Sequence, residues 1–147
     1  MREVRNATME KKILIVDDEP DVVAYLSALF EDNGFSVISA GNGKEGFEMA
    51  TAQRPDLITL DITMPEESGV RLFRSLQQDP ATAEIPVVIV TGISPDFKRF
   101  IETRRQVHPP AAYFEKPVDR DALLARINQL LALSPRPDAG VRSGGST

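Results

Sequence analysis

The sequence contains no cysteine among its 147 residues. This absence excludes disulfides, thiol catalysis and thiolate metal sites. No apolar run approaches the roughly 18 residues that a membrane span needs. The first residues, 1–8, lack the apolar core of a signal peptide. We therefore expect a cytoplasmic protein that does not enter a membrane.

Basic residues are outnumbered, since 17 Lys and Arg stand against 22 Asp and Glu and give a net charge of −5. That balance argues against a free-standing nucleic-acid binder and fits a discrete acidic site. The chain is long enough to bury a core as one globular domain. We expect a flexible N-terminus over residues 1–10, a folded domain over 11–133, and a flexible tail or linker stub over 134–147.

Strand and helix patterns alternate five times along the expected domain. Short apolar runs predict strands at 12–16, 35–40, 57–60, 87–90 and 112–114. Helical spacing predicts helices at 20–33, 43–53 and 69–78, then from 95 and from 119. This alternation predicts an α/β fold with an open parallel sheet and helices on both faces. If the strand order is 2-1-3-4-5, the first and third strands are neighbours.

Polar side chains follow four of the predicted strands. Asp17 and Asp18 follow the first, Asp61 the third, Thr91 the fourth and Lys116 the fifth. A lone Asp at a strand end more often starts a turn than forms a site. The carboxyl ends of parallel strands, however, meet at one edge of the sheet. Four such ends together therefore indicate a functional site.

The chemistry of these residues suggests a metal and a phosphoryl group. Three crowded carboxylates repel one another, and a hard divalent cation relieves that repulsion. Ligation by oxygen alone favours Mg²⁺. Such a site can transfer phosphoryl groups, with Asp61 attacking in line while Mg²⁺ and Lys116 neutralise the phosphoryl oxygens.

Over residues 11–131 the chain resembles the receiver domain of the two-component response regulators. The resemblance rests on the acidic pair after the first strand, on Asp61 in Asp-x-x-Met-Pro, on Thr91, and on Lys116-Pro117. It implies a flavodoxin-like, doubly wound sheet of five strands in the order 2-1-3-4-5. It also implies that a histidine kinase or a histidine phosphotransfer protein donates a phosphoryl group to Asp61.

The resemblance implies a role for each residue of the site. Asp18 and Asp61 would bind Mg²⁺ directly, together with the backbone carbonyl of Thr63. Asp17 would act on the metal mostly through water, and Lys116 would hold a phosphoryl oxygen.

Switching and lifetime follow from the same resemblance. Thr91 would turn toward the phosphoryl group, and Tyr113 matches the switch aromatic, although an ordinary half-buried strand tyrosine is an equal alternative. Thr63 and Ile93 would flank the water that hydrolyses the phosphorylated Asp61. Because Ile93 cannot orient a water, we expect a long-lived phosphorylated form.

The stretch between Thr91 and Lys116 is longer than is usual in the family. Its predicted helix, which starts at Pro95, is basic, and a solvated helix face is the expected reason. His108, the single histidine, lies between prolines and is expected in a surface loop rather than as a phosphodonor.

Two other functions stay open. One is a magnesium-dependent phosphatase of the haloacid dehalogenase type, which uses an aspartyl-phosphate but places its nucleophile on the first strand. The other is a receiver fragment of a transcription factor or a hybrid histidine kinase, because too few residues follow Leu133 for a helix-turn-helix. We expect a phosphoacceptor signalling domain rather than an enzyme. It would signal to a downstream protein through no output domain of its own and without touching nucleic acid.

Overall fold

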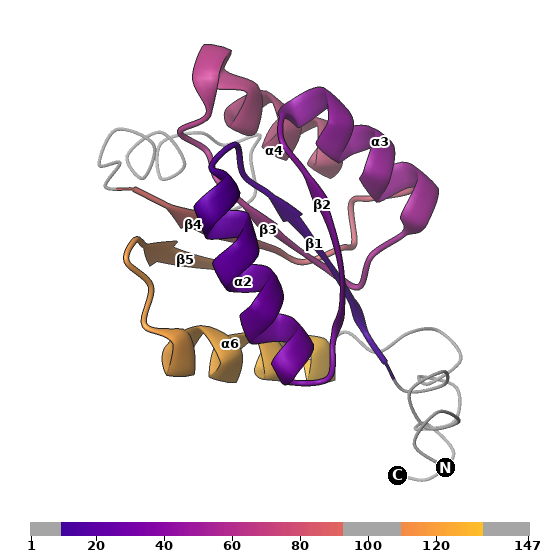
Figure 1. Cartoon of the computed structure of the whole chain (residues 1–147). Coiled ribbons are helices and arrows are strands. Elements are labelled where there is room, and N and C mark those ends of the chain that lie inside the picture. The colour runs from indigo at the N-terminus through magenta and orange to yellow at the C-terminus, as the bar shows by residue number, and fades with distance from the viewer. Residues whose placement is uncertain (1–9, 93–109, 134–147) are drawn as a thin grey trace, which may run out of the picture.

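A computed structural model describes residues 10–92 and 110–133 of the chain (Figure 1). Its strands are β1 (Lys12–Val16), β2 (Ser36–Ala40), β3 (Leu57–Leu60), β4 (Val87–Thr91) and β5 (Ala112–Glu115). Its helices are α2 (Pro20–Asp32), α3 (Gly43–Gln53), the short 3₁₀ helix η1 (Pro65–Glu67), α4 (Ser68–Gln78) and α6 (Arg120–Leu133). Within these two ranges, no helix has both the length and the apolar character that crossing a bilayer requires.

The five strands form one parallel sheet in the order β2-β1-β3-β4-β5. The register pairs Val16 of β1 with Leu60 of β3, and Leu60 with Ile89 of β4. Because the strands are parallel and nearly level, the residues that follow them emerge at one edge. The predicted flavodoxin-like fold and its strand order are confirmed.

Helices cover both faces of the sheet, and each face has its own hydrophobic core (Figure 1). Helices α3 and α4 pack on one face, where Leu72, Phe73 and Leu76 of α4 are buried. Helices α2 and α6 pack on the other, where Phe30, Leu123 and others are buried. β1 and β3 are covered on both sides, which explains their continuous apolar sequences.

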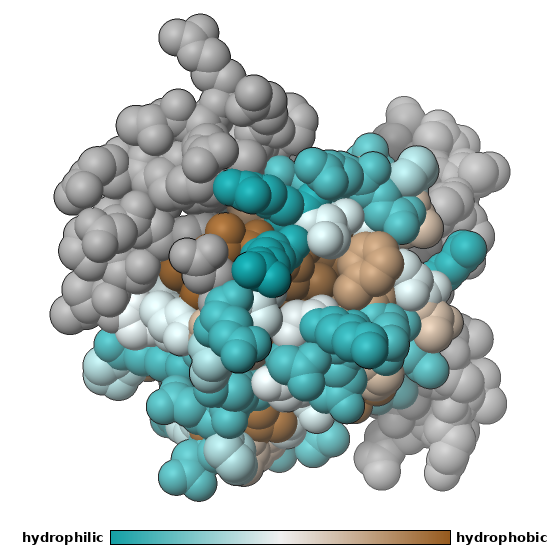
Figure 2. Space-filling view, turned by 90° about the horizontal axis from the view of Figure 1, so that it is seen from above, coloured by the Kyte–Doolittle hydropathy of each residue, from teal (hydrophilic) through white to brown (hydrophobic). Residues whose placement is uncertain are grey.

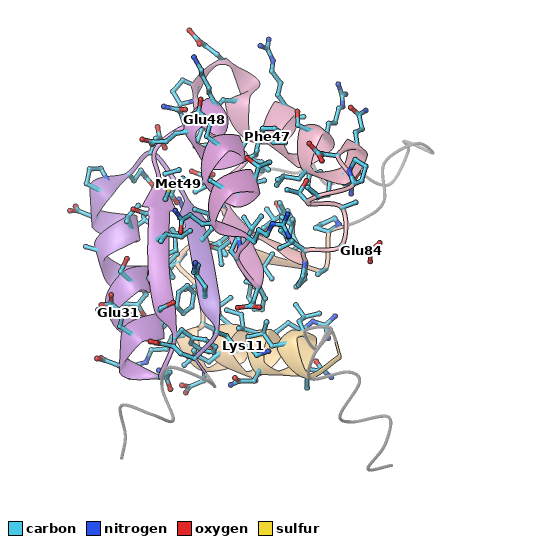
Figure 3. The ribbon with its side chains drawn as sticks, turned by 90° about the vertical axis from the view of Figure 1, so that its right-hand side faces the viewer. Lys11, Glu31, Phe47, Glu48, Met49 and Glu84 are labelled. Atoms are coloured by element: carbon cyan, nitrogen blue, oxygen red, sulfur yellow. The ribbon has the colours of Figure 1, made fainter. Side chains whose placement is uncertain are left out.

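The α3–α4 side shows how an amphipathic helix meets this sheet. Seen from above, it is largely hydrophilic, with hydrophobic atoms visible in the gaps (Figure 2). Along α3, Phe47 and Met49 are partly buried against the core while Glu48 between them is exposed (Figure 3).

The predicted boundaries differ from the observed ones by one or two residues. Phe35 precedes β2, because its N–H donates to the carbonyl of Phe30 at the end of α2 rather than to a strand. Leu124 of α6 is half-buried and packs against the core on the α2–α6 face. Asp119 caps α6, since its Oδ1 accepts from the N–H of Ala122 at 3.1 Å.

Several predictions lie outside the described residues. They are the flexible segments 1–10, apart from its last residue, and 134–147, the basic helix from Pro95, His108 and Ile93.

Candidate functional site

Four polar residues meet at the carboxyl edge of the sheet. The backbone hydrogen bonding between neighbouring strands continues for one residue beyond β3 and β5. The Asp61 N–H donates to the carbonyl of Val16, and the Lys116 N–H donates to the carbonyl of Thr91. These bonds fix where each side chain starts. Lys116 Nζ then lies 3.0 Å from Asp17 Oδ2 and 3.4 Å from Asp61 Oδ2. The predicted convergence of strands one, three, four and five is confirmed.

Asp61 is held by more donors than any other carboxylate of the site. Its Oδ1 accepts from Thr63 N–H at 2.9 Å, from the Thr63 hydroxyl at 2.7 Å and from the Thr91 hydroxyl at 2.7 Å. Burial alone raises the pKa of Asp61, but these three hydrogen bonds and the charge of Lys116 outweigh it and lower the pKa below its usual value. Asp61 is therefore a stable, oriented carboxylate with Oδ2 facing Lys116.

Asp17 is as buried as Asp61 but has fewer donors. Its Oδ1 accepts from Glu19 N–H at 2.9 Å, and its Oδ2 accepts from Lys116. Burial raises the pKa of Asp17 and the neighbouring Asp61 charge adds to this, while the two hydrogen bonds offset it only in part. Ionisation is therefore less favourable for Asp17 than for Asp61.

Lys116 is the shared cation of the site. Its Nζ donates to Glu19 Oε1 at 2.8 Å as well as to Asp17 and Asp61. Burial lowers the pKa of Lys116, but the bonds to Glu19 and Asp17 and the charge of Asp61 raise it more, so the group stays protonated.

Glu19 is a member of the site that the sequence did not predict, whereas Asp18 is exposed. The carboxylates whose oxygens lie within 4.8 Å of one another are those of Asp17, Glu19 and Asp61. Asp18 is exposed and lies outside that group. The expected crowding of Asp18 with the two buried acids stays a prediction.

The donors present fit a hard cation. All of them are oxygens, and three carboxylates at the β1 and β3 ends share the one ammonium of Lys116 among the described residues. Asp18 makes no hydrogen bond within the described residues and is exposed, so its carboxylate is available to turn toward a metal. Its predicted role as a direct ligand stays a prediction.

A glycine fixes the backbone of Asp61 from the other side. A Cβ on Gly69 would lie 2.4 Å from the carbonyl oxygen of Asp61 and 2.6 Å from the Cα of Ile62, a clash that no side-chain movement relieves. The start of α4 therefore packs directly on the end of β3. Gly69 was predicted only as the first residue of a helix, and its proximity to Asp61 has no local sequence signal.

Of the two remaining predicted site residues, the structure describes Tyr113 but not Ile93. Tyr113 on β5 is partly buried and packs against the α3–α4 core, next to Ile89 in the register. Ile93 lies outside the described residues.

Comparison with known proteins gives consistent matches over most of the chain. A family model described as the response regulator receiver domain matches residues 13–128. PilH of Pseudomonas aeruginosa is 38% identical over 82% of this chain and 98% of its own length. RpaA of Synechocystis, a DNA-binding transcriptional regulator, is 34% identical over 90% of this chain but only 54% of its own length.

A solved structure matches as well. The receiver domain of a signal transduction histidine kinase from Syntrophus aciditrophicus has a TM-score of 0.76 and 29% identity, over 86% of this chain and 93% of that one. The relatives therefore include a protein of similar length, a longer DNA-binding regulator and part of a kinase.

Proposed function

The chain belongs to the receiver domains of two-component response regulators, and we propose that Asp61 is its phosphoacceptor. Receiver domains of these systems interact with histidine kinases or histidine phosphotransfer proteins, and a phosphohistidine on such a partner is the proposed donor. One observation carries the assignment. Asp61 is a buried carboxylate whose Oδ1 is held by three donors, which leaves Oδ2 beside Lys116 as the reactive oxygen.

The transfer uses the two oxygens of Asp61 differently. A lone pair of Oδ2 forms the new O–P bond while the P–N bond to the donor imidazole breaks, and the nitrogen keeps that electron pair. The hydrogen bonds to Oδ1 prevent rotation of the carboxylate and keep Oδ2 aimed. Lys116 neutralises charge that develops on the phosphoryl oxygens.

Mg²⁺ is the proposed cofactor, held by Asp18, Asp61 and the Thr63 carbonyl, with Asp17 acting through water. Bound there, it would neutralise the phosphoryl oxygens and the crowded acids. Both oxygens of Asp17 already accept hydrogen bonds, which suits its proposed action through water, whereas the exposed carboxylate of Asp18 can bind the metal directly.

Switching is proposed to run through Thr91 and Tyr113. The Thr91 hydroxyl donates to Asp61 Oδ1 in this structure, and a phosphoryl group on Asp61 offers it new acceptors. A population shift needs contacts that exist in only one state. Thr91→Ala should still accept the phosphoryl group at Asp61 but shift the amide spectrum around Tyr113 less than wild type does.

The phosphorylated form is proposed to be long-lived. Thr63 reaches Asp61 with a short hydroxyl that is already engaged, and Ile93 offers no polar atom to orient a water. Each 1.4 kcal/mol or so of extra barrier slows hydrolysis about tenfold. Thr63→Asn and Ile93→Glu should each shorten a lifetime of many minutes, measured as decay after the donor is removed.

Labelling with acetyl phosphate and Mg²⁺ tests the phosphoacceptor directly. Intact-mass measurement should show one phosphoryl group on wild type and none on Asp61→Asn. Asp32→Asn, which removes an exposed carboxylate at the far end of α2, is the matched control and should be labelled like wild type. Full labelling of Asp61→Asn would remove Asp61 from the role.

The surroundings of the domain are also proposals. The chain is proposed to act in the cytoplasm on a downstream protein, without binding nucleic acid itself. It acts either by itself, at the length of PilH, or within a larger regulator or hybrid kinase, as its longer relatives do. Asp61 follows the third strand, whereas the phosphatase alternative uses the first, so a separate enzymatic activity is not proposed.

A further inference from the structure

Lys116 has a choice of partners in this structure. Its Nζ lies 2.8 Å from Glu19, 3.0 Å from Asp17 and 3.4 Å from Asp61. The shortest contact is thus to Glu19, which has no role in the proposed phosphoryl transfer. The longest is to Asp61, the proposed phosphoacceptor. The ammonium is drawn toward the β1 end of the site.

The backbone of Glu19 is fixed while its carboxylate is free to pair. Its N–H donates to Asp17 Oδ1, and its carbonyl accepts from the N–H groups of Val22 and Val23 at the start of α2. Although Glu19 is the N-cap residue of α2, its side chain does not cap the helix. Its carboxylate contacts Lys116 instead.

This ion pair contributes little to stability, because 59% of the Glu19 side chain is exposed and solvent screens the attraction. Its effect is on position. The bonds to Glu19 and Asp17 use two of the three ammonium N–H groups and hold Nζ at 3.4 Å from Asp61, so they restrain its approach to a phosphoryl oxygen on Asp61. The negative charge of Glu19 also repels an incoming anionic phosphodonor.

We propose that Glu19 is a positioning residue that restrains Lys116 at the β1 end of the site and thereby slows phosphorylation of Asp61. This rests on the function proposed above. In the unphosphorylated protein Glu19 competes with Asp61 for the ammonium. Once the phosphoryl group is attached, its oxygens win that competition and Lys116 leaves Glu19.

Rates of labelling by acetyl phosphate, with saturating Mg²⁺ and low salt, test the proposal. Glu19→Gln removes the competing charge, so it should be labelled about two- to fivefold faster than wild type, the range expected for losing one exposed ion pair. The matched control is Asp21→Asn, which removes an exposed charge two residues further along α2. It should be labelled at the wild-type rate.

A third variant separates contact from charge. Glu19→Asp keeps the negative charge but is one methylene shorter, so it should lose the 2.8 Å contact and approach the rate of Glu19→Gln. Nitrogen NMR of the Lys116 ammonium adds a readout that a merely structural role would not move. In unphosphorylated protein the resonance should shift in both Glu19 variants and stay in place in Asp21→Asn.

The outcomes distinguish the two proposals. If wild type is not labelled at all, the proposed function fails and this inference fails with it. If wild type is labelled but Glu19→Gln is no faster than Asp21→Asn, only this inference is overturned. It is equally overturned if Glu19→Asp behaves as wild type, or if the Lys116 resonance does not respond to Glu19→Gln.

Discussion

The ends of β1 and β3 present two aspartates in nearly the same position but with opposite electrostatics. Asp17 is 3% exposed and Asp61 is 2% exposed, and both contact Lys116. Asp61 accepts four hydrogen bonds and its pKa is lowered. Asp17 accepts two and its pKa is raised. The number of hydrogen-bond donors, rather than the depth of burial, decides whether the pKa of each aspartate is lowered or raised.

The largest expected effect comes from disturbing the close packing of Gly69 on the backbone of Asp61, which fixes the position of one of the two aspartates. Gly69→Ala would place a Cβ against the backbone of Asp61 and Ile62, so we expect a loss of about 3 kcal/mol in the free energy of unfolding. Urea unfolding measures it. Gly41→Ala is the control, since its nearest atom lies 3.9 Å away on Glu45. Equal stabilities of the two variants would contradict the close approach.

Mg²⁺ should remove much of the difference between the two aspartates, because it relieves the repulsion around Asp17. At ten times its dissociation constant it should stabilise wild type by about 1.4 kcal/mol. Asp18→Ala should lose most of this gain, because Asp18 carries free oxygens, and Asp17→Ala should lose less. Thermal melting with and without Mg²⁺ checks this, and an unchanged melting temperature of wild type would count against the site.

Metal-free stability against pH sharpens the comparison. The lowered pKa of Asp61 gives stability that is present above the unfolded pKa of about 3.9 and lost as pH falls through the folded value. The raised pKa of Asp17 has the opposite sign, since its stability is present at low pH and lost as pH rises through the folded value.

Near neutral pH, Asp61→Asn should therefore be less stable than wild type by about 1 kcal/mol, the net worth of a hydrogen bond, and Asp17→Asn should be more stable than wild type. Both differences should shrink toward about pH 3. Chemical unfolding of the metal-free proteins measures them. If both variants were more stable than wild type, or both less stable, the proposed difference between Asp17 and Asp61 would be refuted.

The smallest effect concerns the middle of β3 rather than its end. Thr59 is buried, and its hydroxyl has no hydrogen-bond partner within the described part of the chain. Thr59→Val should stabilise the fold by about 0.5 kcal/mol or somewhat more, since it removes an unsatisfied polar atom at constant shape. Thr91→Val should instead destabilise it, because the Thr91 hydroxyl bonds Asp61. Equilibrium unfolding of the pair decides, and a less stable Thr59→Val would contradict it.

The sequence predicted the sheet and its main site residues because strand periodicity and sheet geometry act together. Asp17, Asp61, Thr91 and Lys116 each follow a readable apolar run, and parallel strands bring such positions to one edge. Even so, the sequence could not say which way each side chain turns.

Three features depend on that missing information. The Glu19 carboxylate contacts Lys116 while Asp18 lies outside the group of close carboxylates, because side-chain direction past a strand end is set by the local backbone and by Lys116. The Thr63 hydroxyl donates to Asp61, a bond that the sequence did not predict. Gly69 touches Asp61 through a packing of β3 on α4 that no spacing reveals.

The two separate hydrophobic cores have a consequence for how the molecule can change. The α3–α4 core and the α2–α6 core share no residue, although each lies against the same strands. Substitutions in contacts that do not meet are close to additive. Mutation or design can therefore alter the outer surface on one face of the sheet without repacking the other face. Variants of either face would keep the same site at the strand ends.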